Sequence, residues 1–165
     1  MTRGTDRTYP ERIVSGGQTG VDRGALDAAI SLGIAHGGWC PRGRLAEDGV
    51  IPERYQLTET SAPQYAIRTR QNVIDSCGTL ILSCGPLHGG TDLTYRLARH
   101  FAKPCLVVDL VQDANAEDVR RWIREHQLRV LNVAGPRESS VPGIASRTRQ
   151  FLIDVLRAAR NQPEE

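Results

Sequence analysis

The sequence has no long apolar segment and no cysteine pattern that would mark a metal or disulfide site. No stretch of its 165 residues approaches the ~20 apolar residues that a membrane-spanning helix needs. The four cysteines form no C-x-x-C pair, and no paired histidines accompany them as a zinc site would require. We therefore predict a protein with no membrane association and no metal centre of its own.

The chain also lacks a strong excess of either charge. Lys and Arg number 21 against 19 Asp and Glu, which gives a net charge of +2 and is too balanced to argue for nucleic-acid binding. Residues 1–10 are polar and lack the apolar core of a signal peptide. We therefore expect a cytoplasmic protein, in which Cys77 and Cys105, set in apolar sequence, are buried free thiols.

Length and composition are those of one globular domain. Hydrophobic residues make up 39% and charged residues 24% of the 165 residues. We expect a flexible leader over residues 1–11, a single domain over residues 12–160, and a polar tail over residues 161–165. A domain of this size buries enough surface to fold without a disulfide or metal staple.

The first of two glycine-rich turns follows the short apolar run that ends at Ser15. The turn consists of Gly16, Gly17, Gln18, Thr19 and Gly20, and a helical pattern begins immediately after it. Thr19 is the expected N-cap of that helix, and Asp22 lies in its first turn, where acids are favoured. Such a turn is either a tight connection or an anion site, because the first N–H groups of a helix attract anions.

A second glycine-rich turn follows the apolar run Leu80–Ser83. It contains His88, Gly89, Gly90 and Thr91 and leads into another helical pattern. Neither turn is a Walker A motif or a clean G-x-G-x-x-G motif. Two strand–glycine–helix units in one small chain favour a single ligand site bounded by both turns.

Strand and helix patterns alternate along the whole chain. The expected strands cover residues 12–15, 34–40, 55–59, 79–83, 104–109 and 128–133; the expected helices cover residues 20–32, 63–76, 93–101, 116–127 and 143–159. Alternation of this kind predicts an α/β fold with a mainly parallel sheet and helices on both faces. Ligands of such sheets bind beyond the carboxyl ends of the strands, where the strand order reverses.

Further candidate residues lie near the same edge of the predicted sheet. The loop over residues 41–54 carries Arg42 and Arg44, and Arg68 lies four residues before Asn72 on one helical face. Asp109 ends a buried strand nineteen residues after Gly90, as does the acid that binds a ribose hydroxyl in dinucleotide folds. Solvated surface positions for the arginines, and a helix cap for the acid, are the alternatives.

Several of these segments together resemble the molybdenum carrier family, a circularly permuted YpsA-like branch of the SLOG superfamily. The matching segments are Ser15–Ala25 (SGGQTGVDRGA), Gly38–Arg44 (GWCPRGR), Ala46–Gly49 (AEDG), Ile51–Tyr55 (IPERY), Asp75–Ser83 (DSCGTLILS), Gly89–Thr91 (GGT) and Lys103–Asp109 (KPCLVVD). The resemblance covers about residues 12–157. The SLOG superfamily is a Rossmann-like group that also includes the lysine-decarboxylase-like phosphoribohydrolases.

The resemblance implies a Rossmann-like three-layer fold, a homo-oligomer (dimer or tetramer), and a carrier role. Relatives bind molybdenum cofactor, a pterin with a phosphate and a dithiolene-held molybdenum, and deliver it to a molybdoenzyme or an insertase. Transferred to this sequence, the cofactor-binding residues would be Gly16, Gly17, Gln18, Thr19, Gly20, Arg42, Arg44, Arg68, His88, Gly89, Gly90, Thr91 and Asp109. Thiolates can bind molybdenum, but no ligand spacing in the sequence supports such a role for Cys40.

Two other functions stay open at the level of sequence. The phosphoribohydrolases carry a glutamate three residues after the threonine of their glycine-glycine-threonine motif, where this chain has Thr94. An enzyme of this kind, acting on nucleoside monophosphates, would need Asp22 or Asp92 as its acid. A nucleotide or ADP-ribose sensor is the third hypothesis, and in both cases the ligand would be a nucleotide. We favour a non-catalytic carrier, because arginines and N–H groups suffice to hold an anion.

Overall fold

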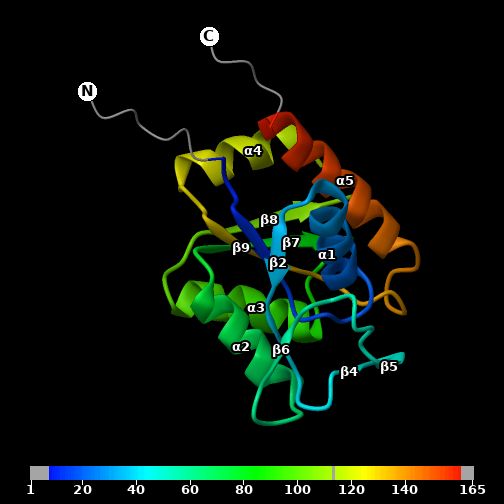
Figure 1. The fold of residues 1–165 in the computed structure, drawn as a ribbon. Helices are drawn as coiled ribbons and strands as arrows, with labels where there is room; N and C mark the ends of the chain where they lie inside the picture. The colour runs from blue at the N-terminus through cyan, green and yellow to red at the C-terminus, as the bar shows by residue number, and fades with distance from the viewer. Residues whose placement is uncertain (1–7, 113, 161–165) are drawn as a thin grey trace.

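A five-stranded parallel sheet forms the centre of the molecule. The computed structural model describes residues 8–112 and 114–160, with strands in the order β2-β1-β9-β7-β8 (Figure 1). The strands are β1 (Arg12–Val14), β2 (Ala35–Gly37), β7 (Gly78–Ser83), β8 (Cys105–Asp109) and β9 (Val130–Ala134). The helices are α1 (Val21–Leu32), α2 (Tyr65–Asp75), α3 (Gly89–His100), α4 (Ala116–Glu125) and α5 (Ile144–Arg160).

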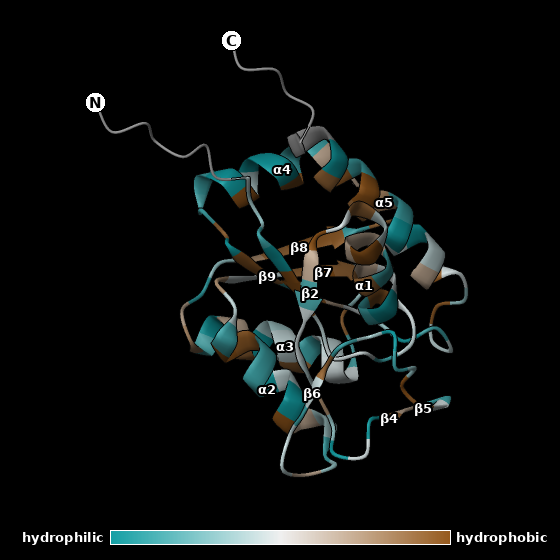
Figure 2. Cartoon of the chain, viewed as in Figure 1, coloured by the Kyte–Doolittle hydropathy of each residue, from teal (hydrophilic) through white to brown (hydrophobic). Residues whose placement is uncertain are grey.

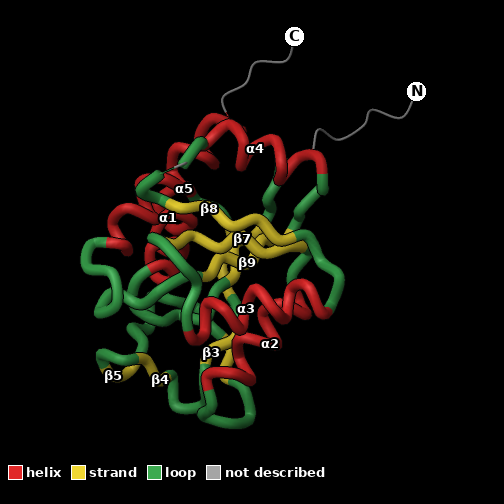
Figure 3. Tube along the Cα trace, turned by 180° about the vertical axis from the view of Figure 1, so that it is seen from behind, coloured by secondary structure: helices red, strands yellow, loops and turns green. Residues whose placement is uncertain are grey.

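The helices form a layer on each face of the sheet. On one face α1 packs against α5, and α5 packs against α4; on the other face α2 packs against α3 (Figures 1 and 3). This arrangement confirms the predicted three-layer α/β fold. None of the helices within the described residues is long and apolar enough to cross a membrane.

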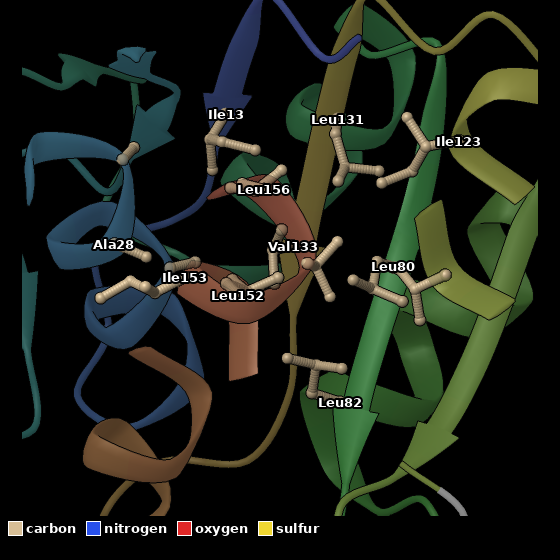
Figure 4. Close-up of a cluster of buried hydrophobic side chains, with 14 of the residues drawn as sticks. Ile13, Ala28, Leu80, Leu82, Ile123, Leu131, Val133, Leu152, Ile153 and Leu156 are labelled. Atoms are coloured by element: carbon tan, nitrogen blue, oxygen red, sulfur yellow. The ribbon is translucent and has the colours of Figure 1, made fainter. Parts of the chain in front are cut away.

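The main core lies between the sheet and the layer of α1, α4 and α5. Leu152 and Leu156 of α5 lie against Val133 of β9 and Ile13 of β1 (Figure 4). β7 is buried along its whole length because helices cover both faces of the sheet, as is usual for a central parallel strand. Accordingly, β7, β8 and β9 are largely hydrophobic in Figure 2, whereas α4 is mainly hydrophilic outside.

The strand order becomes the Rossmann order when the chain is read from β9. Counting β9 as the first strand and then continuing through β1, β2, β7 and β8 gives the order 3-2-1-4-5. The strand order therefore reverses between β9 and β7. The helices that follow these two strands, α5 and α3, lie on opposite faces of the sheet (Figure 1).

The segment between β2 and α2 builds a small second core against α1. Its short strands are β3 (Trp39–Cys40), β4 (Leu45–Ala46), β5 (Gly49–Val50) and β6 (Thr58–Glu59). Buried side chains of this core are Leu26, Cys40, Ala46, Ile51 and Tyr55. The guanidinium of Arg44 donates to the carbonyl oxygens of Ile51, Pro52 and Tyr55 at 2.8 to 3.2 Å, so Arg44 holds this segment in shape.

The predicted strand over residues 34–40 was wrong in one respect, because the chain leaves the sheet at Gly38. Gly38 has φ 123°, and a Cβ there would lie 2.2 Å from the carbonyl oxygen of Ser15. Only a glycine fits this crossing, and β3 beyond it pairs with β6 in a separate two-stranded sheet. The strand expected over residues 55–59 is correspondingly short, covering Thr58–Glu59.

Several smaller expectations also need correction. The N-cap of α1 is Gly20 and makes no side-chain cap hydrogen bond, so Thr19 is not the N-cap. The helix expected from Pro63 begins at Tyr65. Cys77, which immediately precedes β7, is exposed, and Cys105, the first residue of β8, is half-buried.

The expected leader and tail lie mostly outside the described residues. Residues 1–7 of the leader and the whole tail, residues 161–165, are not described. Within the described part of the leader, Pro10 is buried and Tyr9 packs against the main core.

Candidate functional site

A pocket of about 700 Å³ opens at the carboxyl ends of β1, β9 and β7, where the strand order reverses. Four segments line it. They contribute Gly16, Gln18 and Asp22; Arg68, Thr69 and Asn72; Ser83, Cys84, Pro86–Thr91 and Thr94; and Asn132–Arg137 with Ser139–Val141. The volume is within the usual range for a small-molecule site, about 300–1,000 Å³. The position agrees with the edge expected for a ligand of this fold.

The first glycine-rich turn is closed by the protein's own groups. The N–H of Gln18 donates to Asp22 Oδ2 at 3.1 Å, and the N–H of Thr19 donates to Gln18 Oε1 at 3.1 Å. A Cβ at Gly17 would lie 2.5 Å from Leu57 Cδ1, in the second core. The N–H groups of Gln18 and Thr19 therefore already have acceptors.

Asp22 and Arg68 form an ion pair at the base of the pocket. Arg68 Nη1 lies 3.4 Å from Asp22 Oδ2, and the two residues are only 8% and 7% exposed. Burial raises the pKa of Asp22 above its ordinary value, although Arg68 and the N–H groups of Gln18 and Gly16 act in the opposite direction. The guanidinium lies directly over Gly16, where a Cβ would be 1.8 Å from Arg68 Nη1.

Two buried donors in this part of the pocket have no acceptor among the described residues. They are Gln18 Nε2 and Arg68 Nε. The amide of Gln18 is fixed, because its Oε1 accepts the N–H groups of Thr19 and Glu47. A buried donor without an acceptor costs free energy, so each of these atoms needs an acceptor from a water or a ligand.

The second glycine-rich turn is open. A Cβ placed at Gly85, Gly89 or Gly90 would meet no atom within 4 Å. The N-cap of α3, His88, makes no side-chain cap hydrogen bond, and the described residues provide no acceptor for the N–H groups of Gly89 and Gly90. Unpaired N–H groups at a helix N-terminus that faces a pocket can bind an anion.

A third turn, between β9 and α5, completes the wall of the pocket. Arg137 projects toward Tyr65, with its Cζ 5.5 Å from the ring centroid, and Arg68 approaches the same ring at 5.3 Å. The carboxylate of Glu138 accepts the N–H groups of Gly143 at 2.5 Å and Ala145 at 3.0 Å. The two arginines that converge on the pocket are thus Arg68 and Arg137.

Glu47 links the first glycine-rich turn to the third turn. Its carboxylate accepts the Oγ–H of Thr19 and both the N–H, at 3.2 Å, and the Oγ–H, at 2.5 Å, of Ser139. Its backbone N–H fixes Gln18 at 2.9 Å. The hydrogen bonds that the carboxylate accepts from Ser139 and Thr19 lower the pKa of the Glu47 carboxyl group.

Just over half of the predicted site residues line the pocket: Gly16, Gln18, Asp22, Arg68, His88, Gly89, Gly90 and Thr91. The others lie outside its lining: Gly17, Thr19, Gly20, Arg42, Arg44, Asp92 and Asp109. Arg42 donates to the carbonyl of Ser61, and Asp92 pairs with the exposed Arg96 at 3.0 Å. Asp109 accepts the N–H groups of Gly85 and Val111, which lower its pKa.

The sequence-based prediction missed the lining residues of the third turn. They are Asn132, Arg137, Ser139 and Ser140. The signal available in the sequence was the segment Gly135–Glu138, which follows a strand at its carboxyl end. Cys40 is fully buried in the second core, where burial raises the pKa of its thiol, and it does not line the pocket.

The charges of the lining favour an anion and not a bare metal ion. Arg68 and Arg137 are the cationic side chains of the lining, and Asp22 is its carboxylate. Within residues 8–112 and 114–160, no group of three or more His, Cys, Asp or Glu side chains could hold a metal ion. The donor set suits oxyanions, which arginine and backbone N–H groups bind through hydrogen bonds.

Comparison with known proteins agrees with the motifs found in the sequence. A family model described as the circularly permutated YpsA SLOG family matches residues 13–156. A crystal structure named "Putative molybdenum carrier protein", from Syntrophus aciditrophicus SB, is 47% identical in sequence, with a TM-score of 0.86. That match covers 93% of this chain and 99% of that chain. No curated protein matches the chain.

Proposed function

The chain belongs to the circularly permutated YpsA SLOG family, and from this premise we propose that it is a non-catalytic carrier for a small phosphorylated ligand. Molybdenum cofactor is the leading candidate, because the similar crystal structure is named as a molybdenum carrier. The observation that carries the proposal is the open turn at the N-terminus of α3, inside a pocket lined by two arginines.

The phosphate of the ligand would lie at the N-terminus of α3. The N–H groups of Gly89 and Gly90 are available there, and no Cβ keeps a ligand away from the backbone. Arg137, whose side chain is 42% exposed, would supply a mobile positive charge. The unpartnered Gln18 Nε2 and Arg68 Nε would contribute donors to the remainder of the ligand.

Molybdenum cofactor fits this donor set through its oxygen atoms. Its metal is held by the dithiolene of the pterin, so the carrier need not supply metal ligands of its own. The described residues that line the pocket offer N–H and guanidinium donors, which suit the oxygen atoms of such a ligand. Residues of this chain would bind, orient and shield the ligand before its transfer to an acceptor protein.

One observation keeps an enzymatic function as the second candidate. Asp22 lies in the pocket, and burial raises its pKa, as is typical of an acid that can hold a proton. Asp92 does not line the pocket. At the position where phosphoribohydrolases carry glutamate, Thr94 donates its hydroxyl to the carbonyl oxygen of Gly90 at 2.8 Å and provides no carboxylate. An N-glycosidic hydrolase would therefore have to use Asp22.

The test is Gly90→Ala, assayed by thermal unfolding with and without ligand. The position has ordinary helical geometry and open space, so alanine should leave the free protein as stable or stabilise it by up to ~1 kcal/mol. The added methyl group would instead occupy the place of a bound phosphate. Arg96→Gln is the matched control, since it changes an exposed side chain of the same helix outside the pocket.

We expect molybdenum cofactor, under anaerobic conditions, to stabilise the wild-type protein and Arg96→Gln. At 100 times the dissociation constant the stabilisation should be about 2.7 kcal/mol. Gly90→Ala should lose at least 90% of the affinity. If no cofactor, molybdate or nucleotide stabilises the wild type, the carrier proposal fails. If AMP stabilises the protein and is consumed, and Asp22→Asn stops that reaction, the protein is an enzyme.

A further inference from the structure

We propose that two copies of this chain pair through β8, edge to edge, and form a dimer with one continuous sheet. The interface is an antiparallel ladder between the two β8 strands, with its twofold axis at Val107. Ion pairs between Arg99 of one copy and Asp109 of the other flank the ladder. None of these three residues lines the pocket, so the interface goes beyond the proposed function and needs no ligand.

The two edges of the sheet are protected to different extents. At the β2 edge, which is three residues long, the ring of His36 accepts the N–H of Gln56 at 3.2 Å. The guanidinium of Arg12 lies so close to Gly37 that a Cβ there would be 2.0 Å from its Nη2. β8 lies at the opposite edge (Figure 3) and is five residues long, and its first four residues, Cys105–Val108, carry no charge. A long, uncharged edge strand is a template for pairing with another chain.

Half of the backbone groups of β8 point away from the sheet. The N–H of Leu110 donates to the carbonyl oxygen of Ser83 at 2.8 Å, so β7 uses the backbone groups of the even-numbered residues. Successive residues of a strand point their N–H and C=O groups to opposite sides. Those of Cys105, Val107 and Asp109 therefore point outward, and the described residues supply no backbone partner for them.

An antiparallel pairing centred on Val107 would satisfy these outward groups with the same groups of a second copy. Val107 would face Val107 of the other copy, and Cys105 would face Asp109 of the other copy, each as a pair that exchanges two N–H···O=C bonds. The side chain of Val107, which is 41% exposed in the single chain, would be buried against its equivalent. Such a twofold interface uses the same surface on both copies, as is usual for dimers.

The side chains beside this ladder are complementary in charge. Leu106 and Val108 pack in the main core, so Cys105 and Asp109 lie on the other face of the sheet, which α3 covers. Burial raises the pKa of the Cys105 thiol and the guanidinium of Arg99 acts in the opposite direction, because Arg99 of α3 lies close to Cys105. Since Cys105 would face Asp109 of the other copy, the exposed Arg99 would lie beside that carboxylate. The two ion pairs, one on each side of the axis, favour a second copy in this register.

The test measures the oligomeric state of the ligand-free protein by sedimentation equilibrium. We expect the wild type to be a dimer. Val107→Lys places two like charges at the axis and should raise the dissociation constant of the dimer at least tenfold, since lysine on an edge strand opposes pairing. Ile30→Lys is the matched control: Ile30 of α1 is 43% exposed, and its replacement should leave the dimer unchanged.

A second variant tests the ion pairs without changing the strand. Arg99→Glu places two carboxylates beside each other and should also weaken the dimer at least tenfold, because like charges directly opposite each other are destabilising. Arg149→Glu, an equal charge change at an exposed position of α5, should not weaken it. Thermal unfolding checks that each variant is folded, and Arg99→Glu decides the question if Val107→Lys is not.

Hydrogen exchange identifies the ladder itself. The N–H of Val107 should exchange slowly in the wild-type dimer and rapidly in the Arg99→Glu monomer, whereas the N–H of Val108, which points toward β7, should exchange slowly in both. Three results would overturn the proposal: a monomeric wild type, a dimer that neither variant weakens, or rapid exchange at Val107 in the dimer. No ligand is added, so these results leave the carrier proposal untouched, and failure of the ligand assays leaves the dimer untouched.

Discussion

Replacing Gly16 by alanine should disrupt the ion pair at the base of the pocket without touching either charged residue. The new Cβ would lie 1.8 Å from Arg68 Nη1 and 2.6 Å from Arg68 Cζ. The guanidinium is the end of a flexible side chain, so it can move away at little steric cost. Asp22, which is 7% exposed, then loses its partner at 3.4 Å.

The size of the effect follows from the burial of Asp22. Removing one partner of a buried ion pair costs about 3–5 kcal/mol. We expect about 3 kcal/mol, the lower end of that range, because Asp22 keeps the hydrogen bond from Gln18 and the attraction of Arg23. Urea unfolding at pH 7 should show this loss as a lower midpoint with an unchanged slope.

The pH dependence gives the loss a signature that a steric defect would not have. Burial already raises the pKa of Asp22 in the folded protein, and removal of Arg68 raises it further. The cost of an unpaired carboxylate exists only above that pKa, where the group is charged. The stability difference between wild type and Gly16→Ala should therefore shrink as the pH falls through the pKa of Asp22.

A double-mutant cycle with Arg68→Met provides the decisive comparison. If Gly16→Ala acts by displacing Arg68, its cost should nearly vanish in the Arg68→Met background, because no guanidinium is left to displace. Additive losses in the double variant would refute the reasoning. A loss that is independent of pH would refute the role given to Asp22.

Three further predictions concern the framework around the pocket. Lys103→Met should lower the unfolding free energy in urea by about 1–3 kcal/mol, since Nζ donates to the carbonyl oxygens of three residues at the end of α2; wild-type stability would contradict this. Arg44→Met should speed hydrogen exchange over residues 44–57 and leave phosphate affinity unchanged, and weaker phosphate binding would contradict the structural role of Arg44. Burial and the hydrogen bond to Asp27 raise the pKa of Tyr55 to about 12, so stability should fall from pH 10 to 12 and fall less in Tyr55→Phe; titration of all four tyrosines near pH 10 in the folded protein would contradict it.

The fold was predictable because its signals are local and repeated. The continuous apolar run of β7 and the helical spacing of Leu152, Val155 and Leu156 on α5 are visible in the sequence and are buried as expected. The break at Gly38 was not predictable, since it depends on contact with the carbonyl oxygen of Ser15, the residue that follows the neighbouring strand β1. A run of residues with strand character gives no warning that the chain must cross another backbone.

The site was predictable in position and less so in its residues. Both glycine-rich turns look alike as sequence, but distant side chains distinguish them: Leu57 packs over Gly17, whereas none of the described residues packs over Gly90. Arg44 and Arg68 are also alike as sequence candidates. Their roles differ because the guanidinium of Arg44 donates to the carbonyl oxygens of Ile51 and Pro52, within its own segment. Arg68 instead lines the pocket.

The circular permutation has a physical consequence for where an anion can bind. In the Rossmann order the turn after the first strand receives the phosphate, and β9 holds that place in this sheet. Because β9 is here the last strand of the chain, its turn leads into the final helix, and Glu138 caps that helix internally. The open turn instead follows β7, on the other side of the reversal in strand order. If the internal cap by Glu138 is what keeps an anion out of this turn, Glu138→Ala should create a second anion site before α5, and calorimetry should then count two phosphates per chain instead of one. A single phosphate in both proteins would mean that the N–H groups at the start of α5 do not bind an external anion even when no side chain caps them.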